Sequence, residues 1–89
     1  MKELERYRAE ILRIAAQYGA SNLRFCGADA GPGSDLDVLV DIGPGGSLFD
    51  LVDLSRELGE LLGRKVDVLA AASLSPRLLA GMLAEAQTL

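Results

Sequence analysis

Residues 33–40, Gly-Ser-Asp-Leu-Asp-Val-Leu-Val, set two carboxylates two residues apart at the start of an apolar run and constrain the fold more than any other stretch of the chain. Side chains alternate across a β-strand, so Asp35 and Asp37 face one side while Leu36, Val38 and Val40 face the other. The pattern predicts a strand over 36–41 with one face in a core. Its other face carries a pair of carboxylates, which are ligands that Mg²⁺ prefers.

A third acid, Asp67, interrupts the apolar run 65–70 in a similar way. Three carboxylates on adjacent strands could hold one or two Mg²⁺ ions together with a nucleoside triphosphate. Asp35 alone could equally cap a loop after Gly-Ser. Asp37 is harder to explain structurally, since Asp is depleted in strands and costly to bury unless it is paired or bound to a cation. Asp41 lies past the apolar run, and we interpret it as a solvated strand end.

Composition narrows the function classes. A chain of 89 residues is expected to form one small domain, 1–89, with a shallow cleft or one that another chain completes. The net charge of -4 argues against direct binding of nucleic acid. The chain has no His, which excludes a Cys-His nucleophile pair and the usual zinc sites, so Cys26 is interpreted as a small buried hydrophobe. No signal peptide or membrane segment is recognisable, which predicts a cytoplasmic protein.

Hydrophobic periodicity predicts the order α-β-β-α-β-α, an α+β fold in which a small mixed sheet is flanked by helices. The expected elements are a helix over 1–18, strands over 23–27, 36–41 and 65–70, a helix capped by Ser47 that runs to Leu62, and a last helix from Ser75. The three expected buried stripes are Leu4, Tyr7, Ile11, Ile14 and Tyr18; Leu48, Leu51, Leu54, Leu58, Leu61 and Leu62; and Leu79, Met82, Leu83 and Ala86.

Taken together, these motifs resemble the minimal nucleotidyltransferase (MNT) domains of the polymerase-β-like superfamily over nearly the whole chain. Ser34-Asp35-Leu36-Asp37 is similar to the Ser-Asp-x-Asp pair of that family, and Asp67 to its third acid. Residues 46–51 and 74–78 are also similar to members of the family. The resemblance implies the polymerase-β-like nucleotidyltransferase fold.

The resemblance also implies roles for single residues. Asp35, Asp37 and Asp67 would be the catalytic acids and would bind Mg²⁺ or Mn²⁺, with Asp67 also assisting deprotonation of the attacking hydroxyl. Gly27, Ala28 and Ser34 would bind the phosphates of the nucleoside triphosphate.

The first family motif departs from its pattern. Where the family has Gly-Ser-x-Ala-Arg-Gly, residues 27–32 read Gly-Ala-Asp-Ala-Gly-Pro, so Ala28 replaces the serine and no arginine follows. The loop up to Ser34 is also shorter than the family's. Losing the hydroxyl removes a hydrogen bond to a charged phosphate, and such a bond contributes about 1.5–3 kcal/mol to binding. The metal-binding half of the motif set is intact and the phosphate-binding half is eroded.

Two functions follow from the resemblance. In the first, the chain transfers a nucleoside monophosphate, AMP from ATP, to a hydroxyl of a protein partner, as the antitoxin of a HEPN/MNT pair whose partner is a helical HEPN-family protein encoded nearby. In the second, a catalytically weakened MNT fold neutralises its partner by forming a complex. Neither function requires binding to nucleic acid or to a membrane. Both are compatible with a homo-oligomer, so the oligomeric state stays open.

Overall fold

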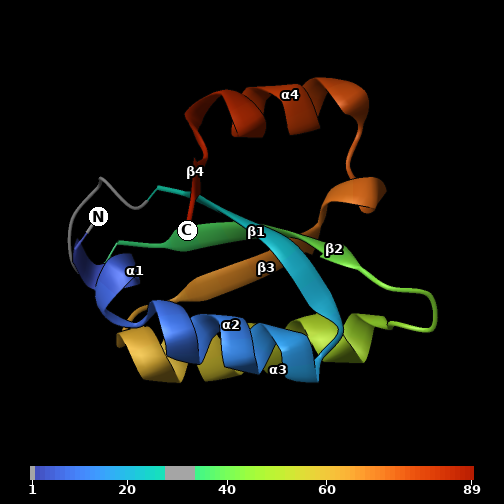
Figure 1. Ribbon diagram of the computed structural model, residues 1–89. Coiled ribbons are helices and arrows are strands. Elements are labelled where there is room, and N and C mark those ends of the chain that lie inside the picture. Colours follow the sequence, from blue (N-terminus) through green and yellow to red (C-terminus); the bar gives the residue numbers. More distant parts are fainter. Residues whose placement is uncertain (1, 28–33) are drawn as a thin grey trace.

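The computed structural model describes residues 2–27 and 34–89 of the chain (Figure 1). The elements are α1 (Lys2–Arg6), α2 (Arg8–Gln17), β1 (Ala20–Cys26), β2 (Leu36–Ile42), α3 (Leu48–Leu62), β3 (Val66–Ala70), the 3₁₀ turn η2 (Ala71–Ser73), α4 (Pro76–Glu85) and β4 (Gln87–Thr88). Within these ranges, no helix is long and apolar enough to span a bilayer.

The strands form one mixed sheet in the order β3-β2-β1-β4. The β1–β2 and β1–β4 pairs are antiparallel, and the β2–β3 pair is parallel. Helices α1, α2 and α3 cover one face of the sheet, and α4 lies over the other face (Figure 1). The predicted α+β fold, a small mixed sheet flanked by helices, is therefore confirmed.

The core lies between the sheet and the helices α1 to α3. Three even-numbered residues of β2 point into it and are fully buried, together with residues of β1, α2 and α3: Leu36, Val38, Val40, Phe25, Ile11, Leu54 and Leu58. The odd-numbered residues of β2 therefore face α4, as strand alternation requires. This division places the acidic side of the strand on the face away from the main core.

The helix predicted over 1–18 is divided at Tyr7, whose φ of -103° and ψ of 14° depart from helical values. The Tyr7 N–H still donates to the Glu3 carbonyl at 3.3 Å, so hydrogen bonding continues across the break. The first strand begins at Ala20 rather than 23, because a bulge at Asn22, with φ of 52°, extends its pairing with β2. Asn tolerates this left-handed conformation better than most residues.

Both ends of α3 agree with the sequence. The Ser47 N–H donates to the Asp50 carboxylate at 3.0 Å, as in a capping box. Gly63 ends the helix with φ of 66° and donates its N–H to the Gly59 carbonyl at 2.8 Å. The expectation that Leu48 faces the core is wrong, because this first residue of α3 lies outside the packed region and is 72% exposed.

The predicted buried stripe on the last helix is also wrong. No residue of α4 is buried, and Leu83 is 40% exposed. The helix does not pack closely on the sheet, because its inner side borders a cavity. The sequence also missed β4, whose two residues return from α4 to pair with β1.

Candidate active site

Asp37 and Asp67 are direct neighbours in the parallel ladder between β2 and β3. Register partners in adjacent strands project to the same side of a sheet. Asp35 lies just before β2, and its charge acts on Asp37. The structure therefore brings Asp37 and Asp67 together on the face toward α4. Asp37 is half-buried, while Asp35 and Asp67 are exposed.

The three carboxylates interact electrostatically. Partial burial raises the pKa of Asp37, and the negative charges of Asp67 and Asp35 raise it further. The positive charge of Lys65 lowers it, but the net shift is upward. Within residues 2–27 and 34–89, the ion pairs of Lys and Arg all involve other acids. Among the described residues, the acidic site therefore has no ion pair of its own, and Lys65 offsets its negative charge only in part.

This charge distribution fits a divalent cation in one particular way. In the described parts of the chain, no three Asp, Glu, Cys or His side chains are grouped so that they could hold a metal ion by themselves. Mg²⁺ is commonly bound through one or two carboxylates, with substrate phosphates and waters completing its shell. The Asp37–Asp67 pair suits that mode, in which the nucleotide supplies further oxygen ligands.

A cavity of about 660 Å³ opens beside Asp37, between β1 and α4. Its sheet side is formed by Cys26, Gly27 and Asp37, and its other side by residues of α4 and by Ser75. Its size lies within the range of small-molecule sites. Gly27, predicted to bind phosphate, and Asp37, predicted to bind a metal ion, therefore border the same cavity.

Gly27 has a structural reason to be glycine. Its φ of 85° is in the left-handed region, and a Cβ there would lie 3.0 Å from the Asp35 carbonyl oxygen. The backbone of Gly27 thus packs against the segment that enters the acid pair. Ala28, the second predicted phosphate-binding residue, lies outside the described residues. Ser34 is described and half-buried.

The sequence analysis missed Arg64. Its side chain is only 3% exposed, its Nε donates to the Ser34 carbonyl at 2.8 Å, and its Nη1 donates to the Glu3 carboxylate at 3.3 Å. Its Nη2 is buried and has no hydrogen-bond partner among residues 2–27 and 34–89. Arg64 therefore fixes the backbone immediately before Asp35 to α1. Periodicity gave no signal for it, since both partners are distant in sequence.

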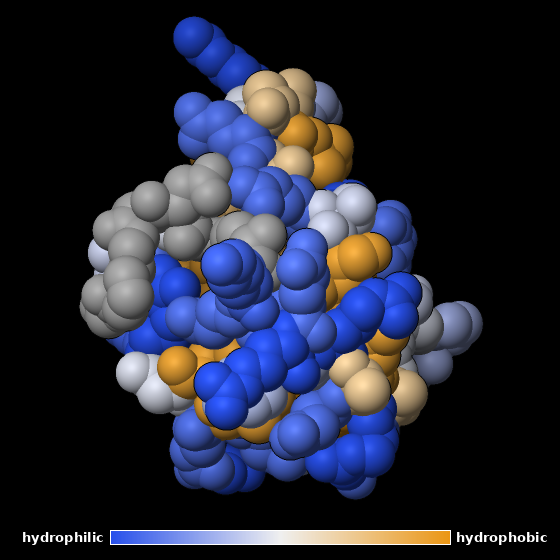
Figure 2. All heavy atoms as spheres, turned by 60° about the vertical axis from the view of Figure 1, so that its left-hand side comes forward, coloured by the Kyte–Doolittle hydropathy of each residue, from blue (hydrophilic) through white to orange (hydrophobic). Residues whose placement is uncertain are grey.

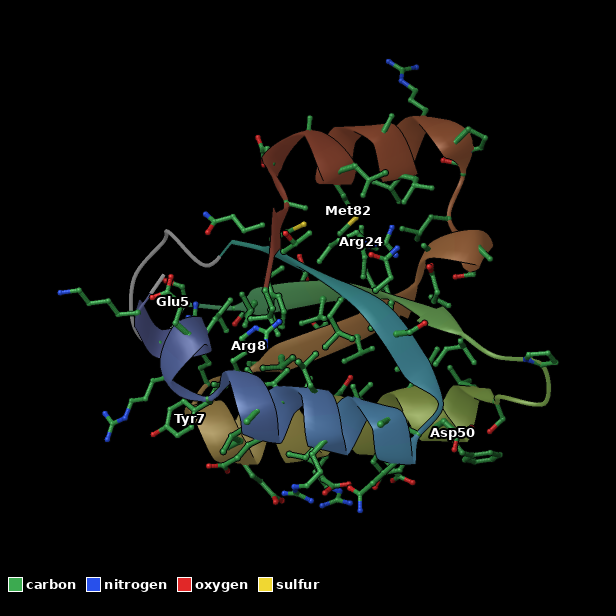
Figure 3. All side chains as sticks on the ribbon, viewed as in Figure 1. Glu5, Tyr7, Arg8, Arg24, Asp50 and Met82 are labelled. Atoms are coloured by element: carbon green, nitrogen blue, oxygen red, sulfur yellow. The ribbon has the colours of Figure 1, made fainter. Side chains whose placement is uncertain are left out.

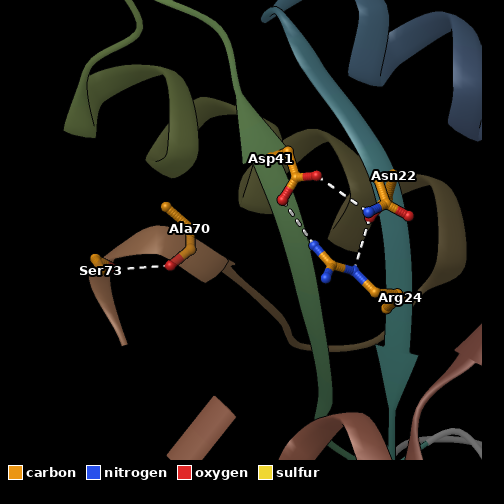
Figure 4. Close-up of polar contacts among 5 residues, drawn as sticks. All are labelled: Asn22, Arg24, Asp41, Ala70 and Ser73. Atoms are coloured by element: carbon orange, nitrogen blue, oxygen red, sulfur yellow. Dashed lines mark hydrogen bonds and ion pairs between the residues drawn. The ribbon is translucent and has the colours of Figure 1, made fainter. Parts of the chain in front are cut away.

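Asp41 is excluded from the acidic site by its own partners. The Arg24 guanidinium donates to one of its oxygens at 2.9 Å and the Asn22 amide to the other at 3.0 Å (Figure 4). The hydrogen bond from Asn22 is the largest cause that lowers the pKa of Asp41. Burial opposes it, and the charge and hydrogen bond of Arg24 lower the pKa further. Asp41 is 52% exposed, as expected for a strand end, and it ties β2 to β1.

Cys26 is buried, as expected, and its thiol donates to the Met82 carbonyl of α4 at 3.4 Å. Burial, then the nearby charges of Asp37 and Glu85, raise the pKa of this thiol. A thiol held in its neutral form is a poor nucleophile. Cys26 therefore connects α4 to β1 rather than contributing chemistry.

The mixed sheet thus carries neighbouring acids on β2 and β3, beside a cavity that Gly27 borders. No protein-family model matches the chain. A Methanocaldococcus jannaschii protein named "Putative protein adenylyltransferase" is 38% identical over 81 residues, which are 86% of this chain and 87% of that protein. A solved structure described as a "putative minimal nucleotidyltransferase" superposes with a TM-score of 0.83 at 36% identity, over 99% of this chain and 94% of its own.

A more distant likeness is to a toxin–antitoxin structure named MntA-HepT, with a TM-score of 0.74 at 16% identity over 94% of this chain and 69% of its own. At that identity the likeness concerns the fold alone. The first two similarities extend over most of both chains at more than a third identity. The chain belongs to the minimal nucleotidyltransferase family.

Proposed function

We propose that this nucleotidyltransferase moves AMP from ATP to a hydroxyl group of a protein partner and that it requires Mg²⁺. The observation that carries the proposal is the pairing of Asp67 with Asp37, the acid that borders a cavity that Gly27 also lines. The name of the Methanocaldococcus jannaschii relative, a protein adenylyltransferase, supports the choice of nucleotide and of acceptor class.

In the proposed reaction, the acceptor hydroxyl oxygen forms a bond to the α-phosphorus while the bond from that phosphorus to the pyrophosphate oxygen breaks. The hydroxyl proton leaves toward the carboxylate of Asp67, and pyrophosphate carries away the displaced electron pair. Asp35 and Asp37 would hold the cation that orients the triphosphate. Bound Mg²⁺ would supply neutralisation of the charge that develops on the phosphate oxygens.

The phosphate-binding role is proposed for Gly27, Ala28 and Ser34. Gly27 lets the backbone come close to Asp35, and a glycine also permits close approach to a phosphate. Arg77 borders the same cavity and brings a cation to it, although the first motif itself has no arginine. We assign Arg77 to charge balance at the phosphates.

We also propose a helical HEPN-family protein as the partner that accepts the nucleotide. The MntA-HepT structure is that of a toxin–antitoxin pair, and a related toxin–antitoxin structure, with a TM-score of 0.74 and 16% identity, was determined with AMP-PNP. Neither identity is high enough to carry the partner by itself. The proposal therefore depends on the neighbouring gene and on the following assay.

The test is transfer of labelled nucleotide from each of four triphosphates to the co-purified partner. Asp37→Asn should abolish transfer, because it removes a charge of the acidic site at almost constant volume. Asp53→Asn, the same substitution at an exposed position of α3, should leave transfer unchanged. Equal silence of the wild type and Asp37→Asn with the genuine partner present would remove the enzymatic proposal.

A second candidate function is partner binding without catalysis. Leu48, Phe49 and Val52, on the first turns of α3, are 72%, 79% and 58% exposed. An apolar cluster of this kind is typical of a protein contact surface. If Asp37→Asn still neutralises the partner and remains in complex with it, complex formation rather than transfer is the function.

A further inference from the structure

The cavity beside Asp37 extends along α4, which spans it without closing on the sheet. At the C-terminal end of α4, β4 pairs with β1 through Arg24 and Thr88, and the Cys26 thiol bonds to the Met82 carbonyl. At its N-terminal end, Ser75 caps the helix. Met82 projects from α4 into the space above the sheet on the side of Arg24 (Figure 3). These contacts hold α4 over the cavity that Gly27 and Asp37 border.

Gly81 lies in the middle of α4 and borders this cavity. Glycine destabilises a helix interior relative to alanine, so its presence there calls for a compensating reason. Packing within the protein gives none, because a Cβ at Gly81 would meet no atom within 4 Å. The open space at Gly81 is on the same cavity that Asp37 and Gly27 border.

The α4 side of the cavity carries both apolar and charged side chains. Leu78 and Met82 lie three residues before Gly81 and one after it, so all three occupy neighbouring positions on one side of the helix, while Arg77 and Glu85 line the cavity four positions before and after Gly81. Leu78 is 53% exposed and so leaves apolar surface open beside the cavity. Apolar groups are also exposed on α4 where it projects at the top of Figure 2.

We infer that the nucleotide base packs against α4 at Gly81, between Leu78 and Met82, while the triphosphate lies toward Gly27 and Asp37. This inference rests on the proposed function, since it places the base of the proposed nucleotide substrate in the part of the cavity away from Asp37. A flat aromatic base gains from apolar contact and needs the room that a missing side chain leaves. Gly81 is thereby a residue that determines specificity for a nucleoside.

The test is the affinity of Gly81→Leu for ATP and for inorganic triphosphate, both with Mg²⁺. Leucine favours the helix but fills the space, so ATP affinity should fall about tenfold or more. Inorganic triphosphate has no base, so its affinity should stay as in the wild type. Ala80→Leu adds the same bulk at an exposed neighbouring position that does not border the cavity, and it should bind both ligands normally. Thermal unfolding of each variant verifies that it is folded.

The outcomes separate this inference from the proposed function. If the wild type binds neither ligand, the proposed function fails and the inference fails with it. If the wild type binds ATP and Gly81→Leu binds it equally well, the inference alone is overturned. The same holds if the wild type binds inorganic triphosphate as tightly as ATP, or if folded Gly81→Leu loses both ligands to the same extent.

Discussion

At the scale of single residues, the least expected contribution is that of a buried cation behind the acidic site. The Arg64 guanidinium reaches the Ser34 carbonyl on one side and Glu3 on the other, and its side chain is almost fully enclosed. Burial of a charge is costly unless hydrogen bonds and an opposite charge compensate for it. Arg64 is therefore a positioning residue, which acts on the acids only through the backbone before Asp35.

We predict that Arg64→Lys destabilises the protein by about 1–3 kcal/mol, because an ammonium group cannot reproduce both directed bonds of the guanidinium. Urea unfolding measures this free energy. Below the unfolding transition, affinity for Mg²⁺-ATP should also fall, since Ser34 and Asp35 lose their anchor. Arg56→Lys is the control, because Arg56 is 57% exposed and its surface ion pairs contribute little. Unchanged ATP affinity in folded Arg64→Lys would contradict the positioning role.

At the scale of elements, α3 and α4 are both capped amphipathic helices, yet only α3 packs residues into the core. Leu54 and Leu58 of α3 are fully buried against the sheet, and the Ser55 hydroxyl accepts a hydrogen bond from the Val68 N–H of β3 at 2.9 Å. No residue of α4 is buried. A helix with few buried apolar contacts opens locally at low free-energy cost.

We predict that loss of a cap has different consequences in the two helices. Asp50→Ala removes the acceptor of the Ser47 N–H in α3 and should lower global stability by about 1 kcal/mol. Ser75→Ala removes the acceptor of the Leu78 N–H in α4 and should mainly raise amide exchange within α4. Thermal unfolding and hydrogen exchange measure the two effects. A loss of melting temperature in Ser75→Ala equal to that in Asp50→Ala would show that α4 belongs to the cooperative core.

At the scale of the whole molecule, electrostatics links the acidic site to stability. The chain carries a net charge of -4, and partial burial, followed by repulsion from Asp67 and Asp35, raises the pKa of Asp37. A carboxyl whose pKa is raised on folding stabilises the fold below its unfolded pKa, and this contribution is lost as the pH rises through the folded value. At neutral pH, the ionised acids therefore destabilise the metal-free protein.

We predict that Mg²⁺ relieves this repulsion and raises the melting temperature. Binding to the folded state alone would add about 2.7 kcal/mol at a concentration one hundred times the dissociation constant. The increase in melting temperature should diminish as the pH falls toward the raised pKa of Asp37, because protons then compete with the cation and the protonated acid binds it poorly. Asp37→Asn should abolish the Mg²⁺ response, while Asp53→Asn should retain it. No response of the wild type at millimolar Mg²⁺ would contradict a metal site.

The sequence alone determined the features that depend on local pattern. Alternation in β2 separated the core residues from Asp35 and Asp37, while Gly63 and the Ser47–Asp50 pair marked the ends of α3. These signals are readable because each depends on residues a few positions apart. The same locality explains the errors at Leu48 and along α4, where periodicity showed an apolar stripe but not whether another element would cover it.

Only the tertiary structure decided which distant residues meet. The parallel register set Asp67 beside Asp37, and the return of β4 to β1 held α4 over a cavity. Arg64 joined Glu3 to Ser34 across 61 and 30 positions of sequence. These contacts depend on chain reversal and strand register, which no local pattern encodes, because they result from packing the whole sheet against its helices at once.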